Sequence, residues 1–176
     1  MASAFFYFYL VSLKRFGHCC KSRLPLTKEQ LDKSLSDRSR FAFKVVDENA
    51  GIIIGHAEIY LTEKSAYLGR ILIGDKQLRG KGIGQTIVHQ LLNFAFKDLN
   101  QSKVELNVFD WNLCAIKCYK KVGFVINPHK KTERTVNGQT SMALNMSIDK
   151  QNWDQLKEHR PNPKKGTTMP QQTNNY

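Results

Sequence analysis

Two short segments of this chain combine residue types at spacings that could do chemistry. The first reads Gln77-Leu78-Arg79-Gly80-Lys81-Gly82-Ile83-Gly84 and stands between a strand-like run and a helical pattern. Glycines at the start of a helix expose backbone N–H groups at the positive end of the helix dipole, and such groups bind phosphate oxygens. Arg79 and Lys81 add positive charge where a polyphosphate would lie. The alternative is a plain strand–turn–helix junction with solvated basic side chains.

The glycine spacing argues against the two common nucleotide-binding loops. A dinucleotide loop reads G-x-G-x-x-G and is followed about 20 residues later by an acidic residue. Here the glycines read G-x-G-x-G, and Gln101, Ser102 and Lys103 stand at about that distance. A Walker loop needs Gly-Lys followed by Ser or Thr, and the chain has none.

The second segment reads Asn112-Leu113-Cys114-Ala115-Ile116-Lys117-Cys118-Tyr119-Lys120-Lys121-Val122-Gly123-Phe124. It resembles the N-x-x-A-x-x-x-Y-x-x-x-G-F segment of the GNAT acetyltransferases, and the earlier Gln77–Gly82 run is similar to their Q-x-x-G-x-G motif. The resemblance covers roughly residues 24–149. The runs Gly69–Asp75 and Phe109–Asn112 are also similar to uncharacterised bacterial members of that family.

The resemblance implies an α/β fold with a mixed, mainly antiparallel sheet flanked by helices. Two neighbouring central strands, here Tyr67–Ile73 and Val104–Phe109, would splay apart. The pantetheine arm of acetyl-CoA would lie between them, and a bulge within Gly69–Leu72 would aim a backbone N–H at the thioester oxygen. The cofactor-binding residues implied in this way are Ile71, Leu72, Ile73, Gln77, Leu78, Arg79, Gly80, Lys81, Gly82, Ile83, Gly84 and Asn112.

The implied reaction is transfer of the acetyl group of acetyl-CoA to a primary amine by direct attack, without an acyl-enzyme. Tyr119 matches the tyrosine that protonates the departing thiolate; its alternative is a core aromatic. Asn112 matches a pantetheine-contacting asparagine, and it could equally be the N-cap of its own helix. Glu58 is a candidate general base, and a surface strand carboxylate is its alternative. No family motif chooses among the other candidates, Glu105, Asn107 and Asp110.

Composition narrows the class of protein further. The 176 residues are 41% hydrophobic, which suits one globular domain, and no run is long and apolar enough to span a membrane. The four cysteines lack the spacing of a disulfide framework or a metal site, so we expect free thiols, no metal and a cytoplasmic location. The formal net charge of +12 admits a nucleic acid, an acidic partner or a polyphosphate such as coenzyme A. No nucleic acid is expected, because the chain lacks a recognition motif.

Hydrophobic periodicity predicts the elements that would position these residues. Thr27 and Gln30 could form a capping box for a helix that ends near Ser36. The remaining predictions are a hairpin of Phe41–Val46 and Ile52–Leu61, the two splayed strands, a helix from Ile83 with apolar residues every three or four positions, a helix from Asn112 to about Lys121, and a closing strand Thr140–Ile148.

The ends of the chain depart from the family pattern. Residues 1–23 would form an atypical N-terminal segment with a first strand at Phe5–Leu13, residues 24–149 the acetyltransferase core, and residues 150–176 a helical turn with a flexible basic tail. The acceptor stays an unknown amine, such as a protein N-terminus or a small amine, and the chain would be a monomer or homodimer. Two other classes stay open: a non-catalytic acyl-CoA-binding relative and a basic nucleic-acid-binding module.

Overall fold

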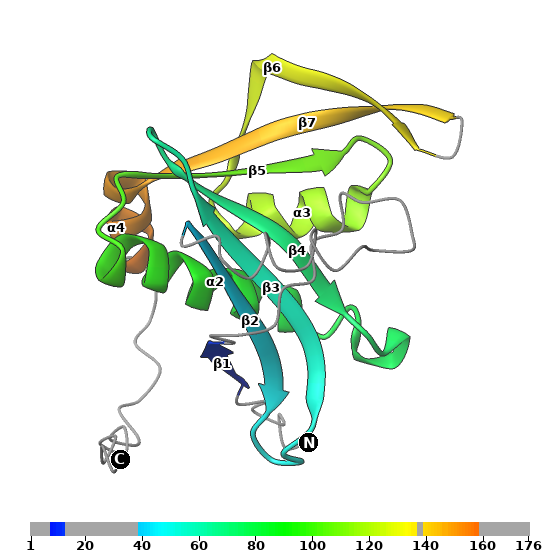
Figure 1. Ribbon diagram of the computed structural model, residues 1–176, viewed down its shortest axis with the longest axis vertical. Coiled ribbons are helices and arrows are strands. Elements are labelled where there is room, and N and C mark those ends of the chain that lie inside the picture. Colours follow the sequence, from blue (N-terminus) through cyan, green and yellow to red (C-terminus); the bar gives the residue numbers. More distant parts are fainter. Residues whose placement is uncertain (1–7, 13–38, 137–138, 159–176) are drawn as a thin grey trace, which may run out of the picture.

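A mixed seven-stranded sheet forms the centre of the molecule (Figure 1). The computed structural model describes residues 8–12, 39–136 and 139–158. Among the described strands, all neighbouring pairs are antiparallel except β4 and β5, which are parallel. The strands lie in the order β1 (Phe8–Ser12), β2 (Arg40–Asp47), β3 (Ile53–Leu61), β4 (Ala66–Ile73), β5 (Lys103–Phe109), β7 (Gln139–Asp149) and β6 (Val125–Val136).

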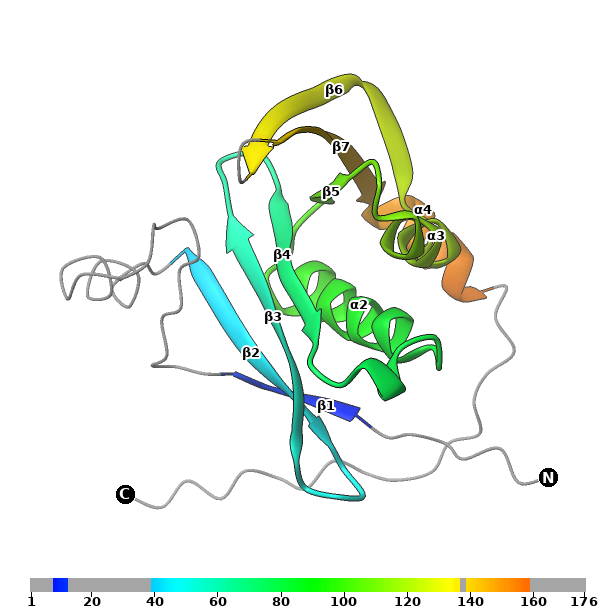
Figure 2. The ribbon, with the colours of Figure 1, turned by 90° about the vertical axis from the view of Figure 1, so that its right-hand side faces the viewer.

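The described α-helices cover one side of this sheet, as Figure 2 shows. A short 3-10 turn, η1 (Lys76–Leu78), leads from β4 towards α2. The α-helices are α2 (Ile83–Asn93), which continues as the π-helical turn η2 (Phe94–Asp98), then α3 (Leu113–Val122) and α4 (Lys150–Glu158). The predicted α/β class with a mixed, mainly antiparallel sheet is confirmed.

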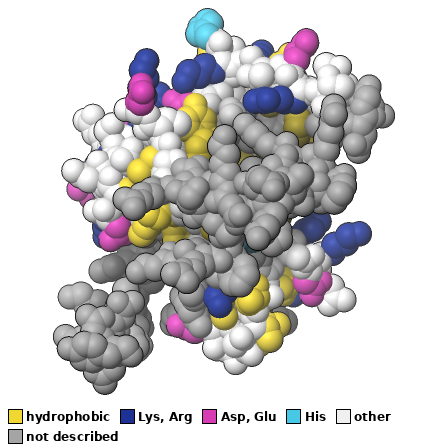
Figure 3. Space-filling model, in the orientation of Figure 1, with side chains coloured by type: hydrophobic (Ala, Val, Ile, Leu, Met, Phe, Trp, Pro, Cys, Tyr) yellow, Lys and Arg dark blue, Asp and Glu magenta, His cyan; other side chains and the backbone are white. Residues whose placement is uncertain are grey.

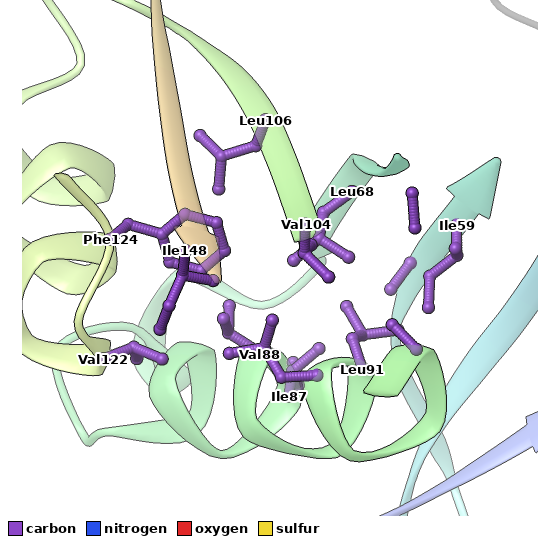
Figure 4. Close-up of a cluster of buried hydrophobic side chains, with 14 of the residues drawn as sticks. Ile59, Leu68, Ile87, Val88, Leu91, Val104, Leu106, Val122, Phe124 and Ile148 are labelled. Carbon is purple, nitrogen blue, oxygen red and sulfur yellow. The ribbon is translucent and has the colours of Figure 1, made fainter. Parts of the chain in front are cut away.

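The apolar stripe of α2 makes the centre of the core. Ile87, Val88 and Leu91 are fully buried and point towards the strands, where they meet Leu68 and Val104 (Figure 4). Burying each such side chain stabilises the fold by about 1.5–3 kcal/mol. The predicted helix from Ile83 is confirmed, and its packing fixes the glycine-rich loop before it against the end of β4.

Alternation along β2 and β3 separates an apolar face from a polar one. Phe41 and Phe43 point to the helix side and meet Phe94 edge-on, with ring centroids 5.5 and 5.3 Å away. Because side chains alternate along a strand, His56 and Glu58 lie on the opposite face. The sheet therefore presents polar side chains on the side away from α2.

Local caps set the ends of α3. The side-chain oxygen of Asn112 accepts a hydrogen bond from the Ala115 N–H at 3.2 Å. Gly123 ends the helix with φ of 115°, a left-handed conformation that favours glycine. The predicted N-cap role of Asn112 and the stop at Gly123 are both confirmed.

Three departures from the sequence predictions concern β6, α4 and Glu58. Strand β6 was not predicted, because its Asn127–Thr135 stretch is polar and its register shifts between Ile126 and Lys131. Helix α4 is longer than a turn, and it buries Trp153. Glu58 is not a surface carboxylate, because only 2% of its side chain is exposed.

Several predictions for the chain ends lie outside the described residues. These are the helix to Ser36 with its Thr27 cap, and the basic tail after Glu158. The predicted first strand is described over Phe8–Ser12. In the described part of the chain, no helix is both long and apolar enough to cross a membrane.

Gly55 allows β3 and β4 to approach closely, and this generates a stability prediction. A Cβ on Gly55 would lie 2.4 Å from the Leu72 backbone oxygen, whereas a Cβ on Gly74 would lie 3.6 Å from the Ile54 oxygen. We expect Gly55→Ala to destabilise the fold by about 1–3 kcal/mol, because backbone must move. Gly74→Ala should change stability by less than about 0.5 kcal/mol. Urea unfolding of both variants measures this, and equal stabilities would contradict the close approach.

Candidate active site

The parallel pairing between β4 and β5 is short. It consists of Ala66 with Val104, Tyr67 with Glu105 and Leu68 with Leu106. Beyond these pairs β4 continues to Ile73 and β5 to Phe109, and the two strands diverge (Figure 1). The predicted splay is therefore confirmed, and the β4 backbone from Gly69 onwards has no strand partner on its β5 side among the described residues.

A bulge interrupts β4 where the splay begins. Glu58 pairs with Gly69 and His56 with Leu72, so Arg70 and Ile71 together face Ala57. Arg70 has φ of 47°, a left-handed conformation that costs a non-glycine residue about 1–2 kcal/mol. The predicted bulge within Gly69–Leu72 is confirmed, and Arg70 is the residue that makes the turn.

The Arg70 side chain secures this strained backbone. Its Nη1 donates to both carboxylate oxygens of Glu58, at 2.7 and 2.8 Å. Glu58 also accepts from Arg40 Nη1 at 3.0 Å, and its Oε1 lies 3.0 Å from His56 Nε2. Hydrogen bonds to charged groups contribute about 1.5–3 kcal/mol each, which is enough to offset the strain.

Glu58 is held as a carboxylate. Burial alone would raise its pKa, but hydrogen bonds from His56 and Arg70 and the charges of Arg70 and Arg40 lower the pKa below its usual value. A carboxylate tied to two guanidinium groups is a weak proton acceptor. Arg40, Arg70 and His56 were not among the predicted site residues. His56 stands two positions before Glu58 on the same strand, so both share one face of it, and this spacing was the signal that could have identified the histidine.

Glu105 on β5 is the second buried carboxylate of the polar face. It accepts hydrogen bonds from the Tyr67 hydroxyl, from Lys130 Nζ at 3.1 Å and from Asn145 Nδ2 at 3.2 Å. Burial raises its pKa, but these three hydrogen bonds outweigh burial, and the net pKa is lowered. Burial and the Glu105 hydrogen bond raise the pKa of Tyr67 to about 12.

The other two base candidates named from the sequence are more exposed. Asn107 and Asp110 are both exposed in the structure. In Figure 3, several lysine and arginine side chains lie towards the upper edge of the view, where Figure 1 places β6 and β7.

The glycine-rich loop connects the end of β4 to the N-terminus of α2. The Asp75 carboxylate accepts from the Gln77 N–H at 2.7 Å and fixes the turn before the loop. Gly80 and Gly82 have φ of 79° and 84°, and a Cβ at either would meet nothing within 4 Å. The two glycines are therefore needed for their left-handed backbone. In the described part of the chain, the Ile83 and Gly84 N–H groups donate to no protein acceptor.

Some side chains of the glycine-rich loop contact the rest of the protein, and others are exposed to solvent. Arg79 donates through Nη2 to the Ile73 carbonyl at 3.1 Å, so it ties the loop to the end of β4. Leu78 packs against the core. Gln77 and Lys81 are exposed.

Gly84 is the point where the separate segments meet. A Cβ there would lie 3.4 Å from Cys118 Sγ on α3 and 4.0 Å from Ile73 Cδ1 on β4. The start of α2, the end of β4 and the middle of α3 are therefore in contact. Tyr119 follows Cys118 directly, so the structure brings the two sequence motifs together.

Tyr119 is a largely buried phenol. Its ring meets Phe124 edge-on, with centroids 6.0 Å apart. Burial, with a smaller contribution from Cys118, raises its pKa to about 12. The hydroxyl thus stays protonated at neutral pH and can donate a hydrogen bond; among the described residues no protein acceptor for it is recorded.

The two described cysteines are free thiols. Burial raises the pKa of Cys118, which disfavours its nucleophilic thiolate form. Across the described ranges, no three His, Cys, Asp or Glu side chains gather in a way that could hold a metal ion.

Comparisons with known proteins agree with this geometry. A family model described as "Acetyltransferase (GNAT) family" matches residues 10–124. The chain is 30% identical over 123 residues to the spermidine N(1)-acetyltransferase of Vibrio cholerae, covering 69% of this chain and 70% of that protein. The corresponding Escherichia coli K12 protein is 30% identical over 131 residues, covering 73% and 68%.

A solved structure gives the same picture. The spermidine N-acetyltransferase of Vibrio cholerae in complex with CoA and spermine has a TM-score of 0.64 at 26% identity, and the match covers 75% of this chain and 80% of that one. The fold is thus shared with a structure that holds CoA.

Proposed function

We propose that this chain, which belongs to the acetyltransferase (GNAT) family, acetylates a primary alkylamine of the polyamine kind within the splay of β4 and β5. The chain is an N-acetyltransferase that transfers the acetyl group of acetyl-CoA to a primary amine. The observation that carries the site is the end of parallel pairing at Leu68 and Leu106, because it leaves β4 without a β5 partner from Gly69 to Ile73, the stretch that leads into the glycine-rich loop.

In this proposal, acetyl-CoA occupies the splay as an added strand. The unpaired β4 backbone of Ile71, Leu72 and Ile73 hydrogen-bonds the pantetheine arm, as extended ligands do at a free sheet edge. The pyrophosphate lies on the loop Gln77–Gly84, where the α2 amides and dipole favour an anion. Arg79 and Lys81 add charge, and the Asn112 side-chain N–H group, left over from capping, contacts the pantetheine.

The proposed reaction is a direct attack. The amine nitrogen bonds to the thioester carbon, the C–S bond breaks, the amine loses one proton, and the CoA thiolate leaves. The raised pKa of Cys118 argues against a cysteine acyl-enzyme. A backbone N–H of the Arg70 bulge stabilises the carbonyl oxygen as it gains negative charge.

Tyr119 acts in this scheme on the leaving sulfur. A pKa of about 12 makes full proton transfer to a thiolate near 8.5 uphill by roughly 3.5 units, or about 5 kcal/mol. A hydrogen bond from the protonated hydroxyl stabilises the thiolate without that cost. We therefore assign Tyr119 as a hydrogen-bond donor, and the proton reaches sulfur from water.

The acceptor class rests on the relatives. Two matched proteins are named spermidine N(1)-acetyltransferases, and the matched structure holds spermine. The described carboxylates Glu58 and Glu105 are already paired with cations, so neither adds an unpaired negative charge for the acceptor.

The first experiment measures CoA release from acetyl-CoA with spermidine, spermine, an aminoglycoside and a peptide N-terminus. We expect spermidine or spermine to give the highest kcat/KM, and acetyl-CoA at a hundred times its Kd to stabilise the fold by about 2.7 kcal/mol. A melt that responds to NADH and not to acetyl-CoA would refute the cofactor site. Turnover confined to the peptide would refute the acceptor class alone.

A matched pair of variants tests the pyrophosphate loop. Gly82→Asp and Gly82→Asn carry similar left-handed strain at φ of 84°, and neither meets crowding. Only aspartate adds negative charge beside the pyrophosphate. Calorimetry should show at least tenfold weaker acetyl-CoA binding for Gly82→Asp than for Gly82→Asn. Equal affinities would move the phosphates away from this loop.

Tyr119→Phe tests the leaving-group role. Loss of one hydrogen bond to a developing charge, worth about 1.5–3 kcal/mol, should lower kcat roughly 10- to 100-fold. Acetyl-CoA affinity and melting temperature should stay within error, because the ring still packs on Phe124. Full kcat in Tyr119→Phe would remove the hydroxyl from the mechanism and leave the cofactor site standing.

A further inference from the structure

We infer that His56, oriented by Glu58, is the general base that takes the proton from the acceptor amine. This inference rests on the proposed function, since it assigns a role in the same site. Its starting observation is the 3.0 Å contact between His56 Nε2 and Glu58 Oε1 on the polar face of the sheet.

The contact defines the tautomer of the neutral ring. Glu58 already accepts hydrogen bonds from Arg40 and Arg70, and an ionised carboxylate has no proton to donate. The hydrogen between His56 and Glu58 must therefore sit on Nε2. The lone pair of the neutral ring is then on Nδ1, for which the described part of the chain records no protein partner.

The position of His56 suits a base that acts at the bulge. His56 pairs in register with Leu72, the first residue after the bulge, on the strand next to the splay. Its side chain is 26% exposed, and that of Glu58 beneath it is 2% exposed. Adjacent strands lie about 4.8 Å apart, so Nδ1 can reach an amine over β4 directly or through one water.

The other candidate bases are engaged elsewhere or exposed. Glu58 is bound by two guanidinium groups, and protonating it would remove the negative charge with which both of them pair. Glu105 is bound by Tyr67, Lys130 and Asn145. His56 alone among these groups combines an orienting carboxylate, a free lone pair and partial exposure.

The charged groups around His56 come from three strands. Lys44 is its register partner on β2, Arg40 and Arg70 reach Glu58 from β2 and β4, and Glu58 lies on its own strand. Of these groups, Glu58 is the one that contacts the ring. The carboxylate–imidazole pair can thus accept a proton and pass it to solvent.

An alkylamine needs such a base more than a weakly basic amine does. At pH 7 about one molecule in 2,500 of an amine with pKa near 10.4 is neutral, against about one in ten for pKa near 8. The loss of activity on removing a base should therefore depend on the amine, which a structural defect would not produce.

His56→Gln tests this directly, because glutamine can still donate to Glu58 but cannot accept a proton as a base. With an alkylamine of pKa near 10.4, kcat/KM should fall about 10²–10⁴-fold at pH 7. With an amine of pKa near 8 the fall should be under about tenfold, and raising the pH should restore the variant on the alkylamine. Equal losses on both amines, or none on the alkylamine, would overturn the assignment.

A second measurement does not depend on turnover. Nitrogen NMR of the histidine-labelled protein, with the His56 signal identified by its loss in His56→Gln, should show the Nε2–H tautomer. An Nδ1–H ring would overturn the assignment whatever the effect of His56→Gln on turnover. If the wild-type protein acetylates neither amine while the tautomer is as expected, the proposed acceptor class fails instead.

Discussion

The short hydrogen-bonded joint between β4 and β5 is the constraint on which the rest of this structure depends. Backbone N–H and C=O groups inside a protein need partners, and a strand that leaves its neighbour must find others. After Leu68, β4 keeps its partner β3 on one side and loses β5 on the other. The resulting edge is short, flanked by α3 and by the start of α2, and suited to one extended ligand and not to another protein strand.

Two buried carboxylates hold the polar face around that edge. Glu58 links Arg40 of β2 to Arg70 of β4, and Glu105 links Tyr67 of β4 to Lys130 of β6. Removing one partner from such a group leaves an uncompensated buried charge, which is far more destabilising than the pair is stabilising. The networks thus define one arrangement of strands on each side of the splay, and they keep the Arg70 bulge in a conformation that its backbone alone would not favour.

Much of the fold could be predicted from local patterns. The stripe from Ile83, the Asn112 cap and the Gly123 stop depend on periodicity and on residues close in sequence, and all three are confirmed. The family resemblance placed a bulge within Gly69–Leu72, but its left-handed residue is Arg70 and not the glycine, which no rule for glycine could indicate. Arg40 and Glu58 stand 18 positions apart, and only the strand register brings them together.

Strand β6 could not be predicted, because it is an irregular edge strand. Its sequence is polar and lacks the alternation of apolar and polar residues that a half-buried strand shows. The role of each site residue remains a prediction.

The joint also divides the sheet mechanically. Strands β1 to β4 form one half of the sheet, and β5, β7 and β6 form the other half; three residue pairs between β4 and β5 connect the halves. Helix α2 packs under both halves, because Leu68 of the first and Val104 of the second contact its apolar face. The two halves of the sheet are thus joined by a short hinge. A ligand hydrogen-bonded along β4 and in contact with α3 would bridge the two halves beyond that hinge, so occupancy of the splay and stiffness of the whole sheet are coupled.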